Sequence, residues 1–117
     1  MRKKNINMDD IEIIEGFYKN SLTNELKSNL NLKKAAIVMI DCDFYNSAKL
    51  VLNFITDLIN DGTILIFDDW YAYKGDPNKG EQKACSEWLE KNKNIKLIPY
   101  KSSGTHQKSF IVNIISN

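Results

Sequence analysis

Two short apolar runs separated by a helix-length segment constrain the fold of this chain more than any other feature. The runs cover residues 35–40 (AAIVMI) and 63–67 (TILIF), and neither contains a charged side chain. Continuous apolar runs of this length are typical of parallel strands that are buried on both faces. The sequence therefore predicts a strand–helix–strand unit whose two strands lie side by side in one parallel sheet.

The segment between the two runs is predicted to be a helix over residues 46–60. Asn46 and Ser47 are its candidate N-caps, and Gly62 stands where a left-handed C-cap is wanted. The apolar side chains of this segment recur on one broad helical face. They are Leu50, Val51, Phe54, Ile55, Leu58 and Ile59.

The rest of the chain adds further elements around this unit. The expected elements are a short strand over 11–14, a helix from Ser21 or Thr23 to Leu30, a helix over 81–91, and strands over 95–100 and 110–115. Strands that alternate with helices predict an α/β fold. We expect a single domain over 1–117, with a mostly parallel sheet and a C-terminal antiparallel strand that closes a hairpin.

Composition argues against several classes of function. The formal net charge of the 117 residues is only +1, which argues against a nucleic-acid partner. No apolar run approaches the ~20 residues that cross a membrane, and no signal peptide is evident. The two cysteines, Cys42 and Cys85, fit neither a disulfide framework nor a zinc-finger spacing. We therefore expect no membrane partner and a reducing, cytoplasmic location.

Four aspartates follow the two apolar runs, at the edge of the sheet where α/β proteins bind ligands. Asp41 and Asp43 come after the first strand, and Asp68 and Asp69 come after the second. Because crowded carboxylates raise each other's pKa, we expect a divalent cation between them, and an all-oxygen set suits Mg²⁺, Ca²⁺ or Mn²⁺. The simpler interpretation is that single aspartates form turns or cap the next helix, as Asp43 could.

Three segments of the chain resemble, in this order, the macrocin O-methyltransferase (TylF/MycF-like) family. They are IEIIEGFYKNSL, IDCDFYNSAKLVLNFITDLINDGTILIFDDW and KGEQKACSEWL, which reach from Ile11 to Leu89. The pattern D-x-D-x-Y-x-S with a later DD pair is the most specific part. The resemblance implies a Rossmann-like class I methyltransferase sheet and methyl transfer from S-adenosylmethionine to a hydroxyl of a glycan or natural product. It also implies that Mg²⁺ holds this small-molecule acceptor.

The resemblance implies roles for individual residues as well. Asp41 and Asp43 are the candidates for catalysis, with Asp43 as a proton acceptor. Trp70 and Tyr71 are the candidates for lining the acceptor pocket. His106 lies in a Gly/Ser loop, where we expect it to be exposed and without a catalytic role. The positions that match metal ligands are Asp41, Asp68 and Asp69.

The chain departs from the family pattern in the half that binds the cofactor. It has no Gly-rich turn between a strand and a helix, and no strand-end acid ahead of Asp41 that suits the cofactor ribose. We therefore interpret 1–117 as a partial domain, the metal and acceptor half, in which the N-terminal cofactor-binding strands are missing. On this interpretation the strand at 35–40 is an apolar edge, and the fragment is inactive alone.

Two alternatives stay open. VMIDCDFYNS resembles the DxDx nucleophile motif of haloacid-dehalogenase-like phosphatases, and IFDD resembles their metal-binding acids. The second alternative is a non-catalytic fragment that binds a partner or forms a homo-oligomer.

Overall fold

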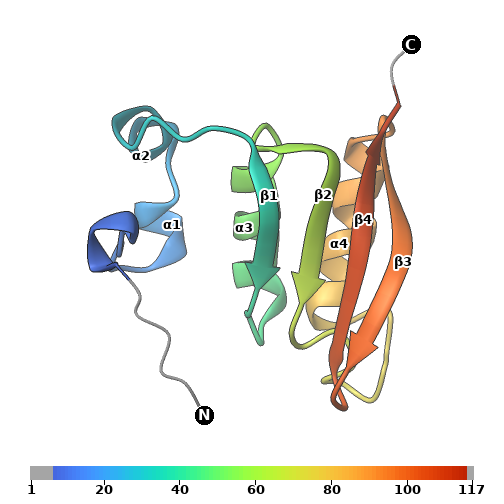
Figure 1. The fold of residues 1–117 in the computed structure, drawn as a ribbon. Coiled ribbons are helices and arrows are strands. Elements are labelled where there is room, and N and C mark those ends of the chain that lie inside the picture. The colour runs from blue at the N-terminus through green and yellow to red at the C-terminus, as the bar shows by residue number, and fades with distance from the viewer. Residues whose placement is uncertain (1–6, 116–117) are drawn as a thin grey trace.

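The computed structural model of the chain describes residues 7–115 (Figure 1). Four strands form its sheet: β1 (Ala35–Ile40), β2 (Ile59–Phe67), β3 (Ile95–Ser103) and β4 (Gln107–Ile114). Helix α3 (Tyr45–Ile55) connects β1 to β2, and α4 (Gly80–Lys91) connects β2 to β3. The N-terminal part forms the short elements η1 (Met8–Asp10), α1 (Tyr18–Ser21) and α2 (Asn24–Asn29).

The strands lie in the order β1-β2-β4-β3. β1 and β2 pair in parallel, whereas β4 lies antiparallel between β2 and β3. β1, β2 and β3 therefore point the same way, and the C-terminal strand is the reversed one. This arrangement confirms the predicted α/β class, a Rossmann-like sheet that is mostly parallel and ends in an antiparallel strand. The predicted terminal hairpin is formed by β3 and β4.

Both long helices cover the same face of the sheet, where Figure 1 shows them behind the strands. Full burial of one Leu, Ile or Phe side chain stabilises a fold by roughly 1.5–3 kcal/mol, so this layer contributes most of the packing. Trp88 Nε1 donates to Thr56 Oγ1 at 2.9 Å and joins α4 to the end of α3. The core between helices and sheet includes Ile40, Leu65, Phe67, Val112, Leu52, Ile55, Ala84, Cys85 and Trp88.

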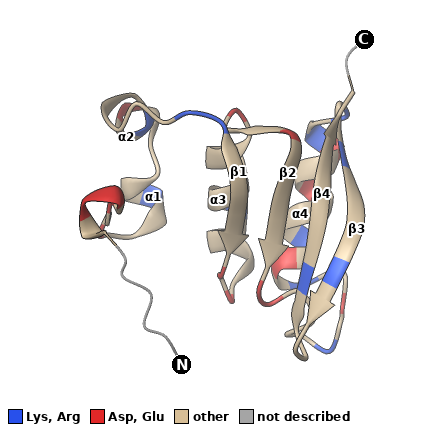
Figure 2. Ribbon diagram, in the orientation of Figure 1, with Lys and Arg blue, Asp and Glu red and all other residues tan. Residues whose placement is uncertain are grey.

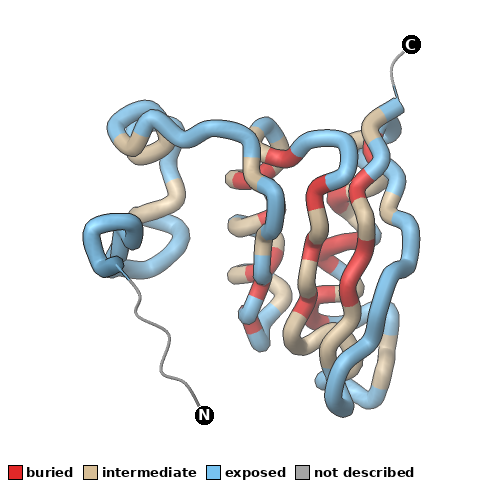
Figure 3. Tube along the Cα trace, viewed as in Figure 1, coloured by how far each residue is buried: buried red, intermediate tan, exposed pale blue. Residues whose placement is uncertain are grey.

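The opposite face of the sheet is uncovered in the described part of the chain (Figure 3). On β1, the side chain of Ile40 is 1% exposed, but those of Ile37 and Met39 are 65% and 53% exposed. Successive side chains of a strand point to opposite faces, and only one face here carries helices. The prediction that this strand is buried on both faces is therefore wrong within residues 7–115. β1 also stands at the end of the strand order, as the predicted edge strand.

The boundary between α3 and β2 differs from the predicted one, because β2 already begins at Ile59. Thr63 Oγ1 accepts a hydrogen bond from Asn60 N–H at 2.9 Å and donates one to Ala35 O at 2.6 Å. These bonds fold residues 59–63 into an irregularity of the strand beside β1. Gly62 has a φ of 92° inside this segment, so it is not the C-cap of the helix.

The start and the buried face of α3 also differ from the prediction. Phe44 is the N-cap and makes no side-chain capping bond, so Asn46 and Ser47 lie inside the helix. Of the predicted face, Ile55 is buried and Val51 and Phe54 pack against the core, but the side chain of Leu50 is 37% exposed. The observed buried stripe follows the spacing i, i+4, i+7 of a helix that packs on a sheet. Its members are Ala48, Leu52 and Ile55.

Of the two elements predicted in the N-terminal segment, the strand is absent and the helix is present. Residues 11–14 form no strand, and none of the four described strands pairs with them. Ile13 is accordingly 70% exposed, and without a paired neighbour an apolar run does not stay in a sheet. The predicted helix toward Leu30 is present as α2, where Thr23 Oγ1 caps by accepting Leu26 N–H at 3.1 Å.

The remaining elements lie close to where the sequence predicts them. α4 begins one residue before the predicted range of 81–91, and β3 and β4 extend further toward the turn that joins them. Among the helices within residues 7–115, none has the length and apolar character needed to cross a membrane.

The one-sided cover of β1 can be tested with two identical substitutions on the same strand. Ile40→Val should lower the free energy of unfolding by about 1 kcal/mol, because it removes a buried methylene. Ile37→Val should change it by less than about 0.5 kcal/mol, because that side chain is exposed. Urea unfolding measures both. Equal losses would show that the second face is covered in solution.

Candidate metal centre

The parallel pairing of β1 and β2 brings their acidic ends together. Ile40 is the partner of Phe67 in the register, and Asp68 N–H donates to Ile40 O at 2.9 Å just beyond it. The residues that follow both strands therefore emerge at the same edge of the sheet. Figure 2 shows acidic segments at the ends of both strands and at the start of α4.

Three of the four aspartates converge at this edge. Asp41, Asp68 and Asp69 each offer one carboxylate oxygen, and these oxygens lie within 4.8 Å of one another. Oxygens that share one ion are separated by up to about twice the metal–oxygen distance, which is about 4–5 Å for Mg²⁺ or Ca²⁺. The spacing of the three carboxylates therefore fits a hard divalent cation.

Asp69 supplies a second observation in favour of a cation. Its Oδ2 is buried and has no hydrogen-bond partner within residues 7–115. Burial and, after it, the neighbouring carboxylates of Asp43 and Asp41 together raise the pKa of Asp69 to about 6. A buried acceptor without a donor is costly, and a metal ion would satisfy it.

Asp43 lies beside this cluster and does not cap α3. The N-cap of that helix is Phe44, so the capping interpretation of Asp43 is wrong. The backbone oxygen of Asp43 accepts a hydrogen bond from Tyr73 Oη at 2.8 Å, and its carboxylate interacts with Asp69. Asp43 therefore contributes to the negative charge around the cluster.

Glu81 is a part of the site that the sequence interpretation missed. Its side chain is 1% exposed, and its two oxygens accept Asp69 N–H at 2.9 Å and Cys42 N–H at 3.3 Å. Burial raises the pKa of Glu81 to about 8, although the two backbone hydrogen bonds act in the opposite direction. A signal was present, because Glu81 shares its helix face with the apolar Ala84 and Cys85, three and four residues later.

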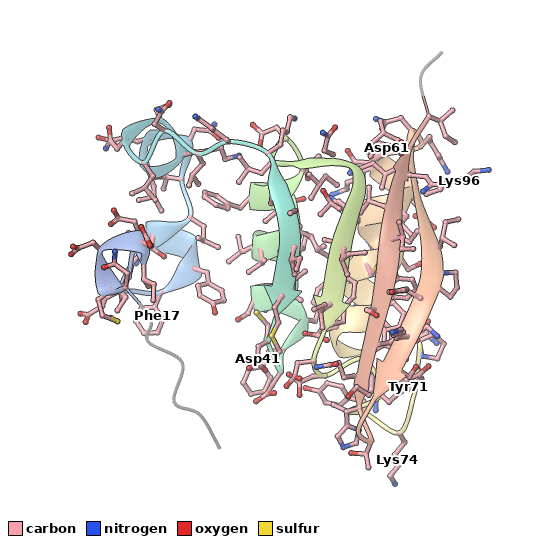
Figure 4. All side chains as sticks on the ribbon, viewed as in Figure 1. Phe17, Asp41, Asp61, Tyr71, Lys74 and Lys96 are labelled. Carbon is pink, nitrogen blue, oxygen red and sulfur yellow. The ribbon has the colours of Figure 1, made fainter. Side chains whose placement is uncertain are left out.

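The two aromatic candidates for the acceptor pocket differ in their surroundings. Trp70 packs against Phe67 in a tilted arrangement and against Phe110 edge-on, with ring centroids 4.9 and 5.0 Å away, so much of it belongs to the core. Tyr71 is half-buried and its N–H donates to His106 O at 3.1 Å. Figure 4 places Tyr71 and Asp41 at the same end of the sheet.

A cavity of about 300 Å³ opens beside the acids. Gln107 Nε2 donates to Asp68 Oδ1 at 3.1 Å across its wall. His106 is exposed, as predicted, and it also lines this cavity. The β3–β4 turn thus surrounds the acids with hydroxyl, amide and imidazole groups that suit a polar ligand. The lining residues are Asp68, Asp69, Ser103, Gly104, Thr105, His106 and Gln107.

Comparison with known proteins adds a family match and two similar structures. Residues 1–96 match the family described as Macrocin-O-methyltransferase (TylF). The fold is similar to the O-methyltransferase NovP, with a TM-score of 0.61 and 18% identity over 82% of this chain and 35% of NovP. It is also similar to CalS11, a TDP-rhamnose 3'-O-methyltransferase of calicheamicin biosynthesis, with a TM-score of 0.56 and 22% identity over 84% of this chain and 40% of CalS11. No curated protein sequence matches significantly. The chain spans less than half the length of either structure.

Proposed function

Because the chain belongs to the macrocin-O-methyltransferase (TylF) family, we propose that it forms the metal- and acceptor-binding part of an O-methyltransferase. The methyl donor is S-adenosylmethionine, the metal is Mg²⁺, and the acceptor is a hydroxyl of a sugar or natural product. The observation that supports this proposal best is the convergence of the Asp41, Asp68 and Asp69 carboxylates within 4.8 Å.

Each part of the site has a role in this proposal. Asp41, Asp68 and Asp69 hold the metal. A bound Mg²⁺ supplies a Lewis acid that lowers the pKa of an acceptor hydroxyl. Asp43, beside Asp69, takes the proton that this hydroxyl releases.

The acceptor is proposed to enter through the cavity beside the acids. Ser103, Thr105 and Gln107 line this cavity and offer hydrogen bonds to further hydroxyls of the acceptor. Tyr71 lies at the same edge and orients the ring of the acceptor. Holding the hydroxyl in one orientation contributes to the rate because the reacting atoms no longer need to find each other.

The cofactor is proposed to be held largely by polypeptide outside this sequence. S-adenosylmethionine supplies the methyl group. The chain has no Gly-rich strand-to-helix turn for it, and no strand within residues 7–115 pairs with the outer edge of β1, the strand that precedes Asp41. Cys42 and Cys85 are free thiols, in line with the proposed cytoplasmic location.

Calorimetry on the chain tests both halves of this proposal. We expect measurable binding of Mg²⁺ or Mn²⁺, and no measurable binding of S-adenosylmethionine at about 1 mM, the upper end of usual enzyme affinities. Methyl transfer should require a version extended by the preceding strands of the sheet. Micromolar binding of S-adenosylmethionine to the chain alone would contradict the proposed division of the site, and absence of metal binding would contradict the proposed metal centre.

The calorimetry also tests one of the two alternatives. A non-catalytic fragment needs no metal, so metal binding counts against it. Against the phosphatase, the family match over residues 1–96 supports a methyltransferase.

A further inference from the structure

One buried carboxylate joins the two segments that carry the candidate metal ligands. Glu81 Oε1 accepts the N–H of Asp69, and Glu81 Oε2 accepts the N–H of Cys42, which directly follows Asp41. This bridge ties together the two segments that follow the directly paired ends of β1 and β2. The separation of their side-chain carboxylates depends on it.

The position of Glu81 is itself constrained by the start of α4. Gly80 has a φ of 56°, and a Cβ at this position would lie 2.6 Å from the Tyr73 ring. Tyr73 in turn holds the backbone oxygen of Asp43. Gln82 Nε2 donates to Trp70 O at 2.9 Å, so three consecutive residues of α4 contact the segments around the acids.

We propose that Glu81 is a positioning residue for the metal centre, which holds the backbone at Cys42 and Asp69 so that Asp41, Asp68 and Asp69 converge. This inference rests on the proposed function, because it assumes that the three aspartates bind a metal. Glu81 is not itself a ligand in this role. Its two oxygens are already used by the two backbone N–H groups.

The choice of residue follows from the chemistry of the bridge. Two N–H donors that face one buried point need two acceptors, and a carboxylate supplies both from one side chain. An apolar residue would leave both N–H groups without a partner in a buried place. A glutamine would satisfy one N–H group and present its own NH₂ donor to the other.

The test is the affinity of the chain for Mn²⁺, measured by electron paramagnetic resonance. We expect Glu81→Gln to weaken binding by about 10-fold to 100-fold, as is usual for groups that orient metal ligands. The matched control is Glu90→Gln, the same change at an exposed position of the same helix, which should leave the affinity unchanged. If Glu81 only stabilises the fold, Glu81→Gln should lower the melting temperature but leave the Mn²⁺ affinity of the folded protein within about twofold of wild type.

A measurement on the wild-type chain covers the case in which Glu81→Gln does not fold. Addition of Mg²⁺ should slow amide hydrogen exchange at Cys42 and Asp69 together, because both N–H groups share one acceptor. No change at either amide would overturn the inference. If wild type and Glu81→Gln bind Mn²⁺ equally, only the inference fails. If the wild type binds no Mn²⁺, the proposed metal centre fails and the inference fails with it.

Discussion

Replacing Asp69 with Asn is expected to reduce the affinity of the chain for Mn²⁺ by more than about 100-fold. The substitution removes a charge and one oxygen from a set of three carboxylates that lie within 4.8 Å of one another. Loss of a ligand should exceed the 10-fold to 100-fold loss typical of groups that only orient ligands. The metal-free variant should at the same time be more stable than wild type, since burial and two neighbouring carboxylates disfavour the charge of Asp69.

The matched control for this variant is Asp61→Asn. Asp61 lies near the other end of the same strand, where its Oδ1 accepts Ile114 N–H at 2.9 Å, and an Asn oxygen can still accept this bond. Titration with Mn²⁺ and thermal unfolding without metal measure the two expected effects of Asp69→Asn. Unchanged affinity would remove Asp69 from the set of ligands.

The metal-free chain is expected to lose stability as the pH rises from about 4 to about 8. The pKa of Asp69 is raised from 3.8 to about 6, so between these values the folded state binds more protons than the unfolded state. Stability then falls with rising pH, because ionisation of Asp69 is less favourable in the folded state than in the unfolded state. The pKa of Glu81, raised from 4.5 to about 8, shifts stability in the same direction over its own range.

Urea unfolding at pH 5 and pH 8 measures this loss. Mg²⁺ at pH 8 should restore stability, because the ion offsets the charge that burial disfavours. Asp69→Asn should make the profile shallower below pH 6, whereas the loss between pH 6 and 8 should remain because it belongs to Glu81. A stability that rises over this range without metal would contradict the assignment of these carboxyls as destabilised in their charged form.

The acids could be located from the sequence because the signal for them is local. AAIVMI and TILIF are apolar throughout and each ends at aspartates, and parallel strands place such ends at one edge. Nothing beyond this order is needed to predict that Asp41 and Asp68 come close. Neither the chemistry of the ion nor the identity of the acceptor follows from the same pattern.

Other features depend on contacts between distant parts of the chain, which local sequence patterns do not specify. Gly62 is the residue type that usually forms a helix C-cap. It lies within β2 instead, next to Thr63, whose Oγ1 donates a hydrogen bond to Ala35 O. Glu81 is a polar residue in a helical pattern, and its burial requires the ends of two strands that lie 39 and 12 residues away. Such long-range partners override local propensity.

The uncovered face and free edge of β1 have a consequence for how the chain behaves in concentrated solution. An apolar edge strand is a template to which strands of other molecules can add, and AAIVMI has the β-branched, uncharged character of segments that form fibrils. Lys33 and Lys34 precede it, and Asp41 and Asp43 follow it. Stacking identical strands in register would place these like charges beside one another, so they act as gatekeepers against aggregation. Asp41, which we propose as a metal ligand, therefore also protects the chain from self-assembly, and a neutral residue at this position should weaken that protection.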